Sequence, residues 1–437
     1  MLTPTRYLMW AAGTMAALAA LTLAFTVAVD PYYIFGTPGI GGFNAVKTLA
    51  VNQAVSAKTY QLERTHPRTL LLGNSRVAVG LDPMSPEWPV SMQPVFNAGL
   101  SGRDLAIAAR LLEDALADGG LRTVIVGLDV LDFLGPEQPA ADPDDAVTGG
   151  PDGARMRLDH DMRPSASRPI ALLKDWLSAT FTLDALADSA LTVLAQGSPS
   201  ASSMTPLGFE PLAEYRVYAR QHGFRSLFDQ KQAQYAARFP HYVEHDFADP
   251  YQAANFRSLR QIIQNSLRYN CQVFLIIYPY HAWVLDLIRT NGLWPSFEAW
   301  KRAVVRVAAD LGKSQVRIVD FSGYNAFATE AVPAANDLHT EMRWYWEAGH
   351  FQPALGDRII GRLFGQERRF GQELTPATIE SVLYSIRAEA DRLQRVAKRD
   401  MVLLCLNSDQ PRAPGLSGTA LASATHPDSI VKGSPCR

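Results

Sequence analysis

A serine and an arginine stand where a strongly apolar run ends, in the stretch LLLGNSR at residues 70–76. A serine hydroxyl becomes a nucleophile only when a neighbouring base removes its proton. Ligands of open parallel sheets bind outside the carboxyl ends of the strands, so Ser75 is a candidate for such chemistry. The structural alternative is a helix cap, the common role of serine in a strand-to-helix turn. Its neighbours are Asn74 and Arg76, and the arginine either contacts charge at a site or forms a structural salt bridge.

An acid and a histidine three residues apart follow far downstream, in WEAGHFQPALGDRII at residues 346–360. In a turn, Glu347 can bond one ring nitrogen of His350 and leave the other to take a proton from a hydroxyl. Such a pair is also common as a surface contact, and no third ligand at metal-site spacing accompanies it. Asp337 and His339 form a rival pair, which is second choice because no helix follows it.

Further candidate residues follow other apolar runs. Gly99 and Gly102, in NAGLSGRDL, allow backbone amides to approach a ligand closely. Asp129 is the last residue of the apolar run at 123–129. His281 and Trp283, in YPYHAW, follow the apolar run at 271–279. Packing and capping are the alternative roles for His281 and Trp283.

The elements that must position these residues alternate between two kinds. Apolar runs without polar alternation predict buried parallel strands at residues 69–73, 95–99, 123–129, 271–279 and 316–321. Segments with apolar residues at helical spacing lie between them, at 103–120, 251–270 and 296–312. This order predicts an α/β fold of three layers with a flavodoxin-like parallel sheet.

The alternation is interrupted, so the fold is predicted in segments. We expect the first half of the domain at 31–134, an inserted region at 135–250 and the second half at 251–370. The insertion begins with a Pro/Asp/Gly-rich stretch that predicts a solvated loop, continues with a helical segment near 170–196, and could cap the carboxyl edge of the sheet. An amphipathic helix is predicted at 375–399, within segment 371–400, with Thr375 as its cap. Residues 401–437 predict a disordered tail.

The N-terminal segment, residues 1–30, contains an uncharged apolar run at 8–29 that reaches about 33 Å as a helix. We expect an uncleaved signal anchor with a cytoplasmic N-terminus, because Arg6 precedes the run and the next basic residue is Lys47. A cleaved signal peptide is the alternative. Tyr32 and Tyr33 suit either a membrane interface or packing on the domain.

Composition excludes some functions. Lys and Arg number 41 against 43 Asp and Glu, so no overall basic field attracts nucleic acid. The three cysteines, Cys271, Cys405 and Cys436, are too few and too scattered for a disulfide framework or a zinc site, although a bridge between the last two is possible.

Three blocks, LLLGNSR, NAGLSGRDL and WEAGHFQPALGDRII, resemble the SGNH (GDSL-like) hydrolase superfamily. The match is most similar to its membrane-anchored extracytoplasmic branch, which includes O-acetylation proteins of bacterial exopolysaccharide and alginate systems. The resemblance implies that Ser75 is the nucleophile, His350 the base and Glu347 the orienting acid. Amides of Ser75 and Gly102 would form the oxyanion hole.

Two departures accompany the resemblance. The usual acid is Asp rather than Glu, and an Asn of the family's third block is replaced here by Asp129 and Asp132. The resemblance implies an esterase or O-acyltransferase acting on a polysaccharide, outside the inner membrane and in the periplasm. Residues Asn74, Arg76, Gly99, Asp129, His281 and Trp283 are then candidate substrate contacts. No metal or organic cofactor is implied.

A transferase that faces outward needs a source of acyl groups, so a multi-pass acyl-exporting membrane protein is the expected partner. The alternative is a catalytically silent domain of the same fold that binds polysaccharide or scaffolds an assembly.

Overall fold

The computed structural model describes residues 3–135, 150–159, 161–312 and 315–408. At its centre is a six-stranded sheet with the order β2-β1-β3-β4-β5-β8. Strands β1 to β5 are parallel and β8 is antiparallel at the edge. The bounds are β1 Thr69–Leu72, β2 Val95–Asn97, β3 Thr123–Leu128, β4 Gln272–Ile277, β5 Val316–Asp320 and β8 Gln372–Leu374. Each of the five predicted apolar runs therefore forms a parallel strand, and the α/β fold is confirmed.

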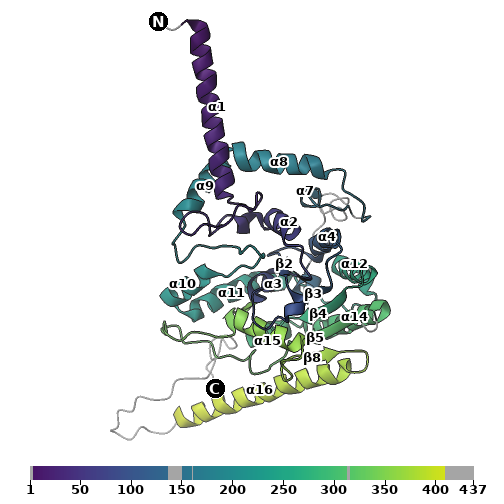
Figure 1. Cartoon of the computed structure of the whole chain (residues 1–437). Helices are drawn as coiled ribbons and strands as arrows, with labels where there is room; N and C mark the ends of the chain where they lie inside the picture. Colours follow the sequence, from purple (N-terminus) through teal and green to yellow (C-terminus); the bar gives the residue numbers. More distant parts are fainter. Residues whose placement is uncertain (1–2, 136–149, 160, 313–314, 409–437) are drawn as a thin grey trace, which may run out of the picture.

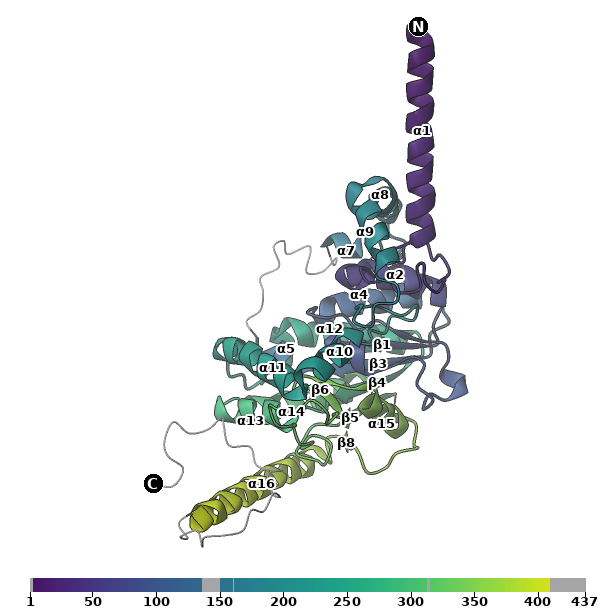
Figure 2. The same ribbon diagram turned by 90° about the vertical axis from the view of Figure 1, so that its left-hand side faces the viewer.

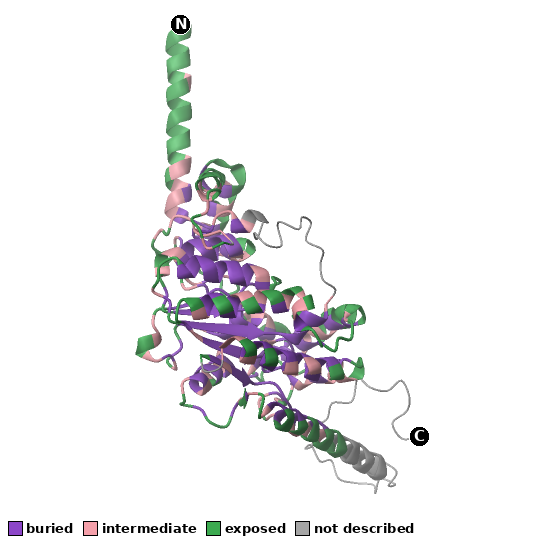
Figure 3. Ribbon diagram, turned by 90° about the vertical axis from the view of Figure 1, so that its right-hand side faces the viewer, coloured by how far each residue is buried: buried purple, intermediate pink, exposed green. Residues whose placement is uncertain are grey.

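Helices cover both faces of this sheet (Figure 1). One face carries α4, α12 and α14, which connect successive parallel strands, and the other carries α3 and α15. The bounds are α2 Ala54–Thr65, α3 Ser75–Gly80, α4 Leu105–Leu116, α5 Val130–Leu134, α12 Ala254–Arg268, α13 Ala282–Thr290, α14 Trp294–Gly312 and α15 Pro353–Leu363. The sheet is buried between these layers, as Figure 3 shows, which explains its uninterrupted Val, Ile and Leu runs.

The helix ends follow local chemistry. Asp104 begins α4, because its carboxylate accepts hydrogen bonds from the backbone N–H groups of Ala106 and Ile107. The last helix, α16 (Ile379–Ser408), begins four residues later than predicted. The Thr375 hydroxyl accepts from the N–H of Thr378 and so forms a turn before the helix instead of capping it.

The insertion divides into two parts that the sequence did not separate. Its helices are α7 Gly150–Gly153, α8 Arg168–Phe181, α9 Leu183–Leu194, α10 Ala213–His222 and α11 Phe224–Arg238. Helices α8 and α9 pack against α1 (Pro4–Val29), whereas α11 packs against β6 (Tyr345–Glu347). The part of the insertion that contains α11 is therefore the one that lies near the carboxyl edge of the sheet.

The loop predicted at the start of the insertion is partly ordered. Met156 is fully buried, and Arg157 forms ion pairs with Asp114 and Asp118. The prediction of a solvated loop is thus wrong for residues 153–159, because these contacts fix them to α4 and its C-terminal turn, whereas residues 161–167 form a largely exposed loop as predicted. Residues 136–149 lie outside the described residues.

Residues 401–408, predicted as the start of a disordered tail, continue helix α16 instead. Helix α16 runs to Ser408, and the rest of the predicted tail, including Cys436, lies outside the described residues. Cys271 is a buried free thiol.

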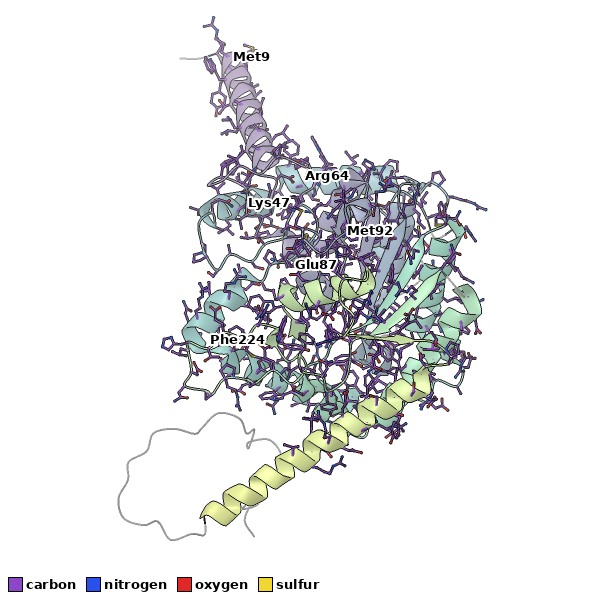
Figure 4. All side chains as sticks on the ribbon, turned by 60° about the horizontal axis from the view of Figure 1, so that its bottom comes forward. Met9, Lys47, Arg64, Glu87, Met92 and Phe224 are labelled. Atoms are coloured by element: carbon purple, nitrogen blue, oxygen red, sulfur yellow. The ribbon has the colours of Figure 1, made fainter. Side chains whose placement is uncertain are left out.

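Helix α1 projects from the domain, as Figure 2 shows, and among the described residues it is the one single helix long and apolar enough to cross a membrane. Its last turn is tied to the domain, because the buried Lys47 ammonium donates to the Val29 carbonyl. The turn that follows the helix is tied as well, since the Arg64 guanidinium donates to the Tyr33 carbonyl. Figure 4 labels both cations below the helix. Tyr32 and Tyr33 are themselves buried, so they pack on the domain.

Candidate active site

Ser75 lies at the first position of α3, directly after β1, and meets the imidazole of His350 there. His350 Nε2 is 2.7 Å from Ser75 Oγ. The other ring nitrogen, Nδ1, forms a hydrogen bond with the Glu347 carboxylate. Residues 275 positions apart in the chain therefore form one acid–imidazole–hydroxyl series.

Glu347 and His350 are paired across a small hairpin made of β6 and β7 (His350–Phe351). The hairpin is seated on α3 by close backbone packing. A Cβ placed at Gly80 would lie 2.1 Å from the Phe351 ring, and one placed at Gly356 would lie 1.9 Å from the Gly80 carbonyl oxygen. Glycine at both positions thus lets the hairpin and α15 approach the helix that begins at Ser75.

The electrostatics of the pair suit a general base. Burial is the largest influence on His350 and lowers the pKa of its imidazole below 6.5, so the ring is neutral at pH 7. Burial alone would raise the pKa of Glu347, but its contacts with His350, Lys231 and the Gly349 N–H hold that pKa at about 2. The ionised Glu347 carboxylate accepts a hydrogen bond from Nδ1–H of the neutral imidazole, which leaves Nε2 unprotonated toward the serine.

A lysine from the insertion contributes to this pair. Lys231 on α11 places its ammonium 3.4 Å from the Glu347 carboxylate. Its positive charge also lowers the pKa of His350. The insertion therefore takes part in the electrostatics of the site.

Arg76 is buried beside Ser75 and organises the surrounding backbone. Its guanidinium forms an ion pair with Asp129 and donates to the Gly349 carbonyl at 2.6 Å and to the Tyr235 hydroxyl at 3.1 Å. These contacts join the β1 turn, the β3 turn, the β6–β7 hairpin and α11. The structure thus places Arg76 in the salt bridge that was one of its two expected roles.

Asn74 connects the same two turns. Its side-chain oxygen accepts from the Arg76 N–H, and its amide nitrogen donates at 3.1 Å to both Asp129 and Asp132. Burial raises the pKa of Asp132 to about 6. The two carboxylates that replace an expected amide are therefore compensated by Arg76 and Asn74.

The two candidate glycines differ in their surroundings. Gly102 has φ of +68° and open space where a Cβ would lie. The Leu100 N–H donates to the Gly73 carbonyl at 2.9 Å, so this turn lies beside the turn that carries Ser75. Gly99 packs against α3 instead, and its N–H and carbonyl are occupied by Asn97 and Lys58.

His281 and Trp283 lie at the start of α13, after β4. One ring nitrogen of His281 accepts from the Trp283 N–H, and the other contacts the Glu330 carbonyl at 3.0 Å. Trp283 packs on Phe228 and under the Arg225 guanidinium. These are capping and packing contacts, the alternative roles expected for both residues.

The rival pair does not assemble. The Asp337 carboxylate accepts from the backbone N–H groups of His339 and Thr340 in an exposed turn. No group of three or more potential metal ligands gathers in the described part of the chain.

Sequence reasoning missed four contributors to the site: Lys231, Tyr235, Gly349 and the Arg76–Asp129 pair as a unit. Lys231 and Tyr235 lie one helical turn apart, a spacing that places both on one face of α11. No motif distinguishes that face in a polar helix. The tip glycine was visible in the sequence, between Glu347 and His350, as a position for a tight turn.

Scanning the chain against protein-family models gives no match, and neither does a search among curated proteins.

Proposed function

We propose that this protein is a serine esterase or O-acyltransferase that works through an acyl-Ser75 intermediate. The observation that carries the proposal is the continuous series from Ser75 Oγ through the neutral His350 imidazole to the buried Glu347 carboxylate. Structural caps do not require a serine bonded to a buried imidazole whose other nitrogen faces an ionised acid.

In the proposed reaction, Ser75 Oγ attacks the carbonyl carbon of an ester while its proton passes to His350 Nε2. Collapse of the tetrahedral intermediate breaks the bond to the leaving alkoxide, which takes that proton. The acyl group is then on Ser75. A sugar hydroxyl or water attacks next, gives its proton to Nε2, and leaves with the acyl group as Ser75 Oγ recovers the proton.

Negative charge that develops on the carbonyl oxygen requires hydrogen-bond donors. We assign this role to the Ser75 and Gly102 amides, whose turns lie side by side. Asp129 is held by Arg76, so its charge is compensated and its carboxylate does not oppose the oxyanion as a free anion.

The substrate class follows from the resemblance to SGNH hydrolases of the O-acetylation branch. We propose a cell-envelope or secreted polysaccharide as acceptor, with the domain on the periplasmic side of the inner membrane that α1 crosses. A multi-pass membrane protein that exports acyl groups would supply the donor. The domain itself requires no metal or organic cofactor in this mechanism.

The test uses the full chain in detergent micelles with p-nitrophenyl acetate as substrate. We expect turnover by the parent protein and a loss of about 10⁴-fold or more in Ser75→Ala, which removes the nucleophile. A fluorophosphonate probe should label the parent protein on Ser75, with fluoride as leaving group, and should leave Ser75→Ala unlabelled.

Ser101→Ala is the matched control, because Ser101 is an exposed serine in the neighbouring turn. It should retain turnover and labelling. Equal turnover in Ser75→Ala and the parent protein would refute the enzyme and favour a polysaccharide-binding domain that performs no chemistry.

A further inference from the structure

Helices α8 and α9 turn large apolar side chains outward. Along α8 these residues recur at spacings of three and four, and along α9 they are eight and three residues apart. These spacings place the residues of each helix on one face. The most exposed are Leu183, Leu194 and Ile170, at 83%, 79% and 75%. The complete set, called here the elbow face, is Ile170, Leu173, Trp176, Leu177, Phe181, Leu183, Leu191 and Leu194.

The partnered charges of the two helices point the other way. Asp175 accepts from the Tyr60 hydroxyl and from Arg155, and Asp188 accepts from the Tyr32 hydroxyl. These acids face the domain. The amphipathic pattern is thus inverted relative to an ordinary surface helix, whose apolar side faces the core. Lys174 and Asp184 are also exposed on these helices. An exposed apolar face of this size still marks a contact with another apolar phase.

The elbow face begins beside the end of the apolar helix α1. The buried Thr26 hydroxyl of α1 lies 3.5 Å from the Thr180 carbonyl, at the bend of 63° between α8 and α9. Figure 1 shows α8 running across the direction of α1, and Figure 3 shows exposed residues along it.

The length of α1 sets the level of this contact. Its apolar run from residue 8 to residue 29 spans about 33 Å, close to the roughly 30 Å of a hydrocarbon core. If residue 8 lies at one boundary of the hydrocarbon core, the opposite boundary falls near Val29. Thr26, and with it the bend at Thr180, lies within one helical turn of that boundary.

We infer that α8 and α9 form an interfacial elbow that lies in the boundary region of the bilayer that α1 crosses, with the elbow face among the acyl chains. The inference rests on α1 as a membrane span and is independent of the acyl-transfer chemistry. Lipid is the occupant because the face is continuous with α1 and lies at the level where its span ends. Interfacial helices commonly insert about 5–10 Å in this way.

This contact would restrict the orientation of the domain. A single spanning helix leaves the domain free to rotate about its tether, whereas a second contact to one side of α1 holds one face of it toward the membrane. The Ser75 site would then keep a fixed orientation to the bilayer.

The experiment places an environment-sensitive NBD fluorophore on single cysteines in the full chain, reconstituted in phosphatidylcholine vesicles. Cys405 and Cys436 are replaced by serine, and Cys271 is buried. Probes go on Leu173→Cys and Leu191→Cys in the elbow face. Leu18→Cys in α1 reports the span, and Tyr384→Cys on α16, at the opposite end of the molecule, reports water. Quenching is measured with nitroxide lipids labelled near the headgroup or near the end of the acyl chain.

We expect both elbow probes to be quenched several-fold more by the headgroup-proximal nitroxide than by the chain-end nitroxide. Leu18→Cys should show the reverse order, and Tyr384→Cys should show little quenching by either. Adding Ile170→Ser and Leu177→Ser, both at exposed positions, should reduce quenching of the Leu191→Cys probe.

Three results overturn the inference. If neither nitroxide quenches the elbow probes, while the chain-end nitroxide still quenches Leu18→Cys, the elbow face lies outside the bilayer and is available to a protein partner. Elbow probes quenched most by the chain-end nitroxide mean a re-entrant segment. A Leu18→Cys probe that escapes both nitroxides removes the span on which the inference rests. None of these results depends on an esterase assay, so failure of this inference can be distinguished from failure of the proposed acyl-transfer chemistry.

Discussion

The turns after β1 and β3 share a capped helix start, but their side chains have different partners. Each follows a buried parallel strand and starts a short helix whose first N–H groups are capped by a polar side chain, Asn74 in one and Asp129 in the other. After β1 the next residue, Ser75, reaches His350. After β3 the Asp129 side chain turns back under Arg76 and stays buried.

The difference shows how an acidic residue at the β3 turn is accommodated beside Ser75. A carboxylate at the β3 turn is costly near a developing oxyanion, and here its charge is neutralised by an arginine from the β1 turn. The two turns therefore act as one electrostatic unit, with Asn74 hydrogen-bonded into both.

The largest effect on this comparison is expected from the acid behind the imidazole. In Glu347→Gln the charge that orients and stabilises the imidazolium is lost, so kcat for p-nitrophenyl acetate should fall by roughly 10²–10⁴-fold with KM little changed. Asp337→Asn, in the exposed rival pair, is the control and should leave kcat as it is. Full activity in Glu347→Gln would mean that the carboxylate has no part in the reaction.

Breaking the link between the turns should cost stability. Arg76→Met leaves Asp129 buried without its cation, and we expect the free energy of unfolding to fall by about 3–5 kcal/mol in urea titrations of the full chain in micelles. The double variant Arg76→Met/Asp129→Asn should recover about 0.5–3 kcal/mol of that loss through their coupling. Additive losses in the double-mutant cycle would contradict a shared unit.

The smallest effect is a shift in pH dependence. Because the His350 imidazole must be neutral to accept a proton, kcat/KM should fall as the pH drops through its pKa, which burial places below 6.5. Glu347, with a pKa of about 2, stays ionised throughout that range. Asp132, whose pKa burial raises to about 6, titrates in the same range, so the acid limb is assigned to His350 only by its displacement in Lys231→Met.

Lys231→Met sharpens this assignment. Removing the cation that lowers the pKa of His350 should move the acid limb to higher pH, with a modest change in the plateau. Lys174→Met, at an exposed position on α8, should leave the limb in place. An unmoved limb in Lys231→Met would separate the insertion from the electrostatics of the site.

The sheet was predictable because its signal is local. Each uninterrupted run of Val, Ile and Leu needs burial on both faces, and residues 69–72, 123–128 and 272–277 form strands as expected. The start of α16 was less predictable, since Thr375 accepts from the Thr378 N–H in a turn that precedes the helix, and a capping side chain fits either arrangement.

The candidate site was predictable in part. Residue type and strand order were enough to bring Ser75 and the Glu347–His350 pair to one edge of the sheet. Arg76–Asp129 and Lys231 were not visible, because these partners come from separate elements and their pairing depends on tertiary packing. The split of the insertion depends on the packing of α8 and α9 against α1 and of α11 against β6, and no local pattern records that packing.

The Gly80–Gly356 contact gives the site an inherent rigidity. Main chain rests directly on main chain there, so the serine-bearing helix and the segment after the histidine cannot slide apart without breaking the core beneath them. Nucleophile and base are thus aligned before any ester arrives, and no lid movement is required to bring them together. A methyl group at position 356 would collide with the Gly80 carbonyl and push α15 away from α3, which would separate His350 from Ser75 although neither residue is changed.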